Sequence, residues 1–170
     1  MKKSELREMI REEILKETNS INTAQEMIPY IEKTIKKYFP KSLYKIEFEH
    51  GLEYYIAISF AVGNKGDFPS GMPINDICYV TSLVQSFNKD GTILGDKLEY
   101  DADRIKSILL KPKEGSHLAF DRAKTKARSK KGTSEQILKQ IDNNFKNLLQ
   151  TLRNNKDNFA KSHQYVNKYI

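Results

Sequence analysis

The middle of the chain alternates between apolar and polar residues. Between Tyr44 and Phe48 every second residue is apolar and the residues between them are charged, which predicts a strand with one face in the core. The run 54–62 carries branched and aromatic residues on one face and small ones on the other, as expected of a central strand covered by helices. Because His50-Gly51 separates the two runs, we expect an antiparallel hairpin.

A third strand is predicted over residues 77–87, after a loop at residues 63–76 that is rich in glycine, proline, asparagine and aspartate. Asn88-Lys89-Asp90-Gly91 then gives a turn, because Asp-Gly supplies the positive φ of a tight hairpin. Short return strands are expected at residues 92–94 and 97–100.

Helical spacing of apolar residues marks both ends of the chain. The pattern predicts an amphipathic helix over residues 4–17 and a second helix from Thr23 to Tyr38. Pro29 removes a backbone donor, so the ordered part of the second helix is expected to begin nearer Ile28.

The last third of the chain is predicted to be helical. Asp101 or Asp103 is expected to cap a helix that stops before Pro112, and another helix is expected from residue 117 to residue 130. Thr133 and Gln136 fit a capping box, which would open the final and most amphipathic helix, residues 133–153.

These elements predict an α+β fold, with a mainly antiparallel sheet (residues 43–100) packed against N-terminal and C-terminal helices. We expect a separable N-terminal helix at residues 1–20, a single domain at 21–155, and a helical extension or tail at 156–170. The sequence contains neither a signal-peptide pattern nor about 18 consecutive apolar residues. We therefore expect no membrane partner and a cytoplasmic location.

The charge is unevenly distributed. Residues 1–100 hold 13 Lys+Arg and 15 Asp+Glu, whereas residues 101–170 hold 16 and 7, which together give the net charge of +7. A basic half favours an anionic partner, and a basic helix can follow phosphates through counterion release. The candidate DNA- or RNA-binding residues are Lys111, Lys113, Arg122, Lys124, Lys126, Arg128, Lys130, Lys131 and Lys139.

No catalytic motif, cofactor or metal site is predicted. The single cysteine, Cys78, excludes an internal disulfide and favours a reducing compartment. None of the three histidines has a ligand partner at metal-binding spacing. Carboxylates cluster at residues 47–53 and 96–103, but they lack the acid-x-lysine order expected of a metal-dependent nuclease, so helix caps and exposed strand faces explain them better.

The segment Ser4–Ile14 (SELREMIREEI) resembles a leader found on many proteins of tailed bacteriophages. Its Leu6-Arg7-Glu8 and Ile10-Arg11-Glu12 triplets, with Leu15-Lys16-Glu17 beyond it, look like the sites that phage prohead proteases cut. This resemblance implies a location in the host cytoplasm or in the virion. A charged amphipathic helix also contains such triplets by chance.

Three functions stay open. The first is a non-enzymatic phage accessory protein that binds nucleic acid through the basic helical region. The second is a virion structural or assembly protein of the head, neck or tail, which would contact a virion partner or itself through the helices at residues 4–17 or 133–153. The third is a metal-dependent nuclease.

Overall fold

A computed structural model describes residues 21–68, 80–105, 130–154, 156–158 and 161–170. Its strands form one antiparallel sheet whose spatial order follows the chain, β1-β2-β3-β4-β5. The strand bounds are β1 Ser42–His50, β2 Tyr54–Val62, β3 Val80–Phe87, β4 Leu98–Ile105 and β5 Lys130–Gly132.

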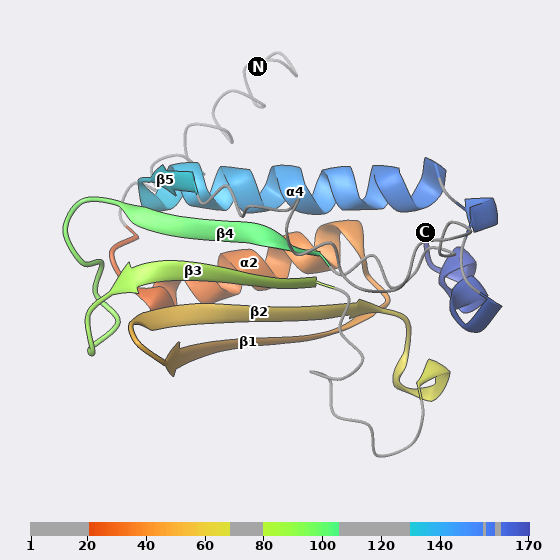
Figure 1. Cartoon of the computed structure of the whole chain (residues 1–170), viewed down its shortest axis with the longest axis horizontal. Coiled ribbons are helices and arrows are strands. Elements are labelled where there is room, and N and C mark those ends of the chain that lie inside the picture. Colours follow the sequence, from red (N-terminus) through yellow and green to blue (C-terminus); the bar gives the residue numbers. More distant parts are fainter. Residues whose placement is uncertain (1–20, 69–79, 106–129, 155, 159–160) are drawn as a thin grey trace, which may run out of the picture.

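Two long helices, α2 (Ala24–Tyr38) and α4 (Ser134–Asn154), lie against the sheet and contact each other. They run in the same direction, so both begin at one end of the sheet and finish at the other (Figure 1). Helix α2 packs on β1 and β2, whereas α4 packs on β4 and β5. The α+β class and the mainly antiparallel sheet predicted from the sequence are confirmed.

An aromatic cluster closes the core between the sheet and the two helices. The ring of Phe60 on β2 lies 4.9 Å from that of Phe39 at the end of α2, and 5.3 Å from that of Phe145 on α4. Phe39 and Phe60 are fully buried, and Phe145 is nearly so. Because the sheet and both helices each contribute one ring here, this cluster fixes how the helices sit on the sheet.

Helix α2 begins at Ala24, not near Ile28 as the sequence suggested. The Thr23 hydroxyl accepts the Glu26 N–H (3.2 Å), and Glu26 Oε2 accepts the Thr23 N–H (3.1 Å). This capping box supplies acceptors for backbone N–H groups at the start of the helix. Pro29 is tolerated inside the helix, and its side chain is exposed. The predicted box at α4 is present, with Gln136 Oε1 accepting the Thr133 N–H (3.0 Å).

Two helices expected after residue 100 are partly replaced by strands. Strand β4 continues to Ile105, so Asp101 and Asp103 lie in a strand and do not cap a helix. Residues 130–132 form the edge strand β5 beside β4, where a helix end was expected. In both segments, pairing with a neighbouring strand decides that a strand forms. The local sequence does not show which strand will be that neighbour. Residues 92–94 form only isolated bridges, with Thr92 and Ile93 as their members.

The C-terminal segment is made of short 3₁₀ turns, η2 (Lys156–Asn158) and η3 (Lys161–Lys168), which lie beyond the end of α4. Tyr169 holds this segment to η1 (Lys65–Asp67), which follows β2, through a hydrogen bond to Asp67 (2.7 Å). Val166 is fully buried in the core, so this part of the predicted tail packs on the domain. The predicted helix at residues 4–17 lies outside the described residues. None of the described helices has the length and apolar character needed to cross a membrane.

Candidate nucleic-acid interface

The end of the domain where α2 and α4 finish is built from segments far apart in sequence. The chain leaves α2 through Phe39 and Pro40, enters β1, and returns to the same end at the close of β2, where η1 follows. The turns η2 and η3 cover this end after α4. Gly63 N–H donates to the Lys41 carbonyl (3.0 Å), which ties the two connections together.

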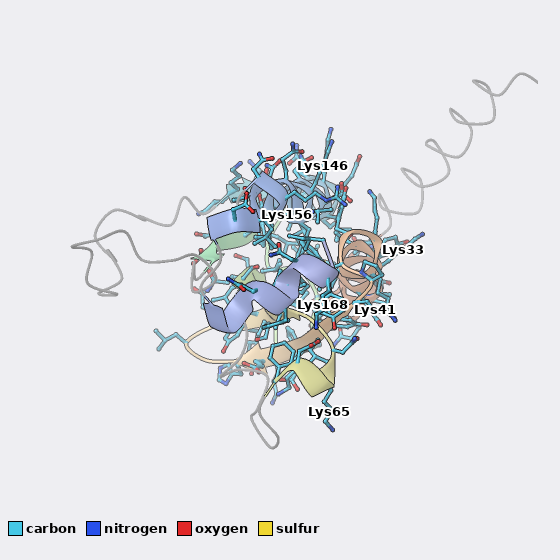
Figure 2. The ribbon with its side chains drawn as sticks, turned by 90° about the vertical axis from the view of Figure 1, so that its right-hand side faces the viewer. Lys33, Lys41, Lys65, Lys146, Lys156 and Lys168 are labelled. Atoms are coloured by element: carbon cyan, nitrogen blue, oxygen red, sulfur yellow. The ribbon has the colours of Figure 1, made fainter. Side chains whose placement is uncertain are left out.

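Figure 2 views this end directly and labels six lysines. Lys41, Lys65, Lys156 and Lys168 belong to the segments that build this end, whereas Lys33 and Lys146 lie further back along α2 and α4. The six lysines come from α2, the α2–β1 connection, η1, α4, η2 and η3, and none of them forms an ion pair with another residue that the structure describes. We call this set the lysine end surface. Its members are Lys33, Lys41, Lys65, Lys146, Lys156 and Lys168.

Three carboxylates close to this surface have hydrogen-bond partners: Glu32, Asp142 and Asp67. Glu32 accepts hydrogen bonds from Lys36 (2.6 Å) and Tyr44 (2.6 Å), and these bonds, Lys36 foremost, hold the pKa of Glu32 below its ordinary value. Asp142 accepts from Lys37 (2.8 Å), whose pKa this bond raises.

Asp67 is held in the same way. It accepts the Tyr169 phenol hydrogen and the Asn64 N–H, and the tyrosine is the main reason that the pKa of Asp67 is lowered, with a smaller effect from the charge of Lys168. Glu32, Asp142 and Asp67 are therefore engaged by Lys36, Lys37 and Tyr169, whereas Asp157 in η2 stays exposed beside Lys156. The six lysines of the end surface form no ion pair with a described carboxylate.

Most of the binding residues expected from the sequence lie outside the described residues. Three of the nine are described, and they sit around β5 and the first turns of α4, at the other end of the sheet (Figure 1). Lys130 donates to Gln140 (3.1 Å) and Lys131 pairs with Glu99 (3.6 Å), while Lys139 lines a cleft. The others lie outside the described residues: Lys111, Lys113, Arg122, Lys124, Lys126 and Arg128.

The carboxylates that a metal-dependent nuclease would use as metal ligands are spread across the sheet. Glu47 belongs to β1 and Asp101 to β4, and the register runs from one to the other through Ala57 and Leu83. At about 4.8 Å per strand, the two carboxylate positions lie roughly 14 Å apart. Within the described ranges no three His, Cys, Asp or Glu side chains come close enough to hold a metal ion.

A cleft of about 720 Å³ lies at the opposite end, between the first turns of α2 and α4 and the β3–β4 connection. Two helix N-termini face this region, a placement that favours anions. However, the capping boxes already use donors of both helices. The buried Ser134 hydroxyl donates to the Ile21 carbonyl (3.0 Å), so the described lining of the cleft offers no buried polar side chain left waiting for a ligand.

Comparison with known proteins returned no match to a family model, a curated protein or a solved structure.

Sequence reasoning missed the lysine end surface because its members do not form a run. Lys33, Lys41 and Lys65 belong to the half of the chain that is nearly neutral overall, and only the fold brings them to the end where Lys156 and Lys168 lie. The one available signal was indirect: Lys41 and Lys156 follow closely after the two long helices, where basic residues commonly mark a helix C-terminus.

Proposed function

We propose that this protein is a non-enzymatic nucleic-acid-binding protein that contacts the phosphate backbone. The observation that carries the proposal is the lysine end surface, whose ammonium groups form no ion pair among the described residues. Ammonium groups spread over a broad surface suit a repeated phosphate charge, because each contact releases counterions from the nucleic acid.

The chemistry of the surface favours backbone contact over base recognition. Its side chains are lysines, which act as flexible point charges, and it has no arginine among the six to read a base edge in a bidentate manner. The aromatic side chains nearby are used in packing: Tyr38 and Tyr169 donate to carboxylates, and Phe68 packs edge-on against Tyr165 with ring centres 5.7 Å apart. We therefore expect little sequence preference and a strong dependence on salt.

The basic residues between positions 111 and 128 lie outside the described residues, but they also support this proposal. Their lysines and arginines give the same chain further positive charge for contact with phosphates. The resemblance of residues 4–14 to phage leaders makes an accessory role during phage infection the setting we propose.

The test is fluorescence anisotropy with labelled duplex DNA and single-stranded RNA at several salt concentrations. A variant with Lys65, Lys156 and Lys168 changed to glutamine removes three charges from the lysine end surface. We expect weaker binding and a salt dependence whose slope falls by about 2 to 3, since each phosphate contact contributes about 0.9.

Two comparison variants locate the interaction. Changing Lys130, Lys131 and Lys139 to glutamine removes the same charge from the other end, and changing Lys89 and Lys97 tests the β3–β4 connection. If only the first variant weakens binding, the lysine end surface is the interface. No binding of the wild type at low salt, or equal binding by the end-surface variant, refutes the proposal.

A further inference from the structure

Strand β1 forms a long open edge of the sheet that the described residues build. Among the described strands it pairs only with β2, in a register that runs without a break from Ser42↔Val62 to His50↔Tyr54. It spans nine residues without proline, glycine or bulge, whereas the opposite edge strand β5 has only three. Proteins usually shorten or interrupt such an edge, because its unpaired backbone groups invite another strand.

Backbone hydrogen bonds show which groups point outward. The Gly63 N–H donates to the Lys41 carbonyl, and the Gly51 N–H donates to the Glu53 carbonyl, each at 3.0 Å. Both pairs continue the β1–β2 register, so the odd-numbered residues of β1 are the ones bonded to β2. The N–H and C=O groups of the even-numbered residues therefore face the open edge: Ser42, Tyr44, Ile46, Phe48 and His50.

The apolar face of this edge is not fully covered. Ile56, Ile58 and Phe60 on β2 are fully buried. Their partners in register on β1 are only partly buried, although they pack against the same core. Tyr44, Ile46 and Phe48 thus leave apolar surface at the border of the sheet, where a further strand would bury it.

We propose that β1 pairs with β1 of a second copy of this chain in an antiparallel two-fold dimer centred on Ile46. In this arrangement every outward-facing residue meets another: Ile46 meets itself, Tyr44 meets Phe48, and Ser42 meets His50. The five outward residues of each copy then have all their edge groups paired. Tyr44 and Phe48 add aromatic contact on the face that the helices cover.

Charge selects this register over its neighbours. With Ile46 on the axis, Lys45 lies opposite Glu47 of the second copy, twice over because of the symmetry. Both side chains are about half-exposed, at 45% and 40%, and they already pair within the strand at 2.6 Å. A register centred on Lys45 or on Glu47 would place like charges directly opposite each other, which destabilises a strand pair.

The two five-stranded sheets would join into one continuous sheet of ten strands, with both α2 helices on the same face. An isologous interface of this kind closes on itself and leaves no further β1 edge for a third copy. The lysine end surfaces of the two copies would lie at opposite ends of the dimer, so dimer formation does not cover them.

Analytical ultracentrifugation of the full chain, without nucleic acid, tests the dimer. The wild type should show a mass that rises with concentration toward that of two chains. Lys45→Glu places a new carboxylate opposite Glu47 of the second copy, and Glu47→Lys creates the corresponding lysine pair. Each single variant should therefore raise the dissociation constant roughly tenfold or more. The double variant restores opposite charges and should recover most of the affinity.

A mixing experiment tests directly whether Lys45 lies opposite Glu47 of the second copy. Each single variant repels itself, but the Lys45→Glu chain and the Glu47→Lys chain complement each other at both contacts. An equimolar mixture should therefore form a heterodimer under conditions where each variant alone is monomeric. Lys89→Glu, in the β3–β4 connection, serves as the charge-matched control and should dimerise like the wild type.

Three results would overturn the proposal: a wild type that stays monomeric at high concentration, single variants that dimerise as well as the wild type, or a mixture that stays monomeric. Circular dichroism melting of each variant separates loss of dimer from loss of fold. Because the readout is mass, failure here leaves the nucleic-acid proposal standing, and the reverse also holds.

Discussion

Tyr169 and Asp67 are joined by a hydrogen bond of 2.7 Å although 102 positions separate them in sequence. The phenol donates, the carboxylate accepts, and Asn64 Nδ2 donates to the same phenol oxygen at 3.1 Å. This contact links the last residues of the chain, just after η3, to the turn η1 that follows β2. Both turns carry lysines of the end surface, so the hydrogen bond helps to hold Lys65 and Lys168 in place.

Tyr169→Phe removes the donor and should lower the midpoint of thermal unfolding by roughly 1–3 °C at pH 7. The bond lowers the pKa of Asp67 from 3.8, so its contribution is present above the pKa of the unfolded chain. It is lost as pH falls through the lower folded value. The difference between wild type and variant should therefore shrink below about pH 4.

Differential scanning calorimetry from pH 3 to pH 7 measures this difference. Tyr30→Phe is the matched control, because no hydrogen bond of the Tyr30 phenol is found among the described residues. If the difference in unfolding midpoint between the wild type and Tyr169→Phe did not change with pH, the Asp67 carboxylate would not be responsible for it.

Phe60→Ala should be the most damaging single substitution in the aromatic cluster. The side chain is fully buried between Phe39 and Phe145, so its removal leaves a cavity between the sheet and both helices and should cost about 3–5 kcal/mol. Urea unfolding monitored by circular dichroism measures the loss. Leu52→Ala, in the exposed hairpin turn, should change stability by less than about 0.5 kcal/mol; a similar loss at both positions would show that the cluster is not the centre of the core.

Gly91→Ala should destabilise the turn between β3 and β4. Gly91 has φ +85°, its N–H donates to the Asn88 carbonyl (3.0 Å), and its carbonyl accepts the Ala24 N–H (2.8 Å). An added Cβ would meet the flexible end of Gln25, so backbone strain dominates the cost, which we expect to be about 1–2 kcal/mol. Gly66→Ala, where a Cβ meets nothing, is the control for urea unfolding; equal effects at both glycines would exclude backbone strain as the cause.

Local chemistry predicted much of this fold. The hairpin of β1 and β2 follows from alternation, the turn that ends at Gly91 follows from Asp-Gly, and the Thr133–Gln136 box marks the start of α4. Each of these signals acts over a few residues, and each element formed where its own sequence favours it.

The errors arose where distant partners decide the structure. The sequence predicts a helix cap at Asp101, but this residue lies on a strand beside Leu83. It also predicts a helix end at Lys130 and Lys131, but these residues pair with Tyr100 and Glu99. In the same way, the lysine end surface could not be predicted, because its members are brought together by the parallel course of α2 and α4.

The matching of strand order to chain order has a consequence for synthesis on the ribosome. Each strand that emerges finds its neighbour already at the growing edge, so the sheet can assemble by short-range steps. Helix α4 emerges last of the large elements, and Phe39 and Phe60 gain their third ring only when Phe145 is made. Until then the apolar face of the nascent sheet is half-covered, which makes this the stage at which the unfinished chain most needs a chaperone.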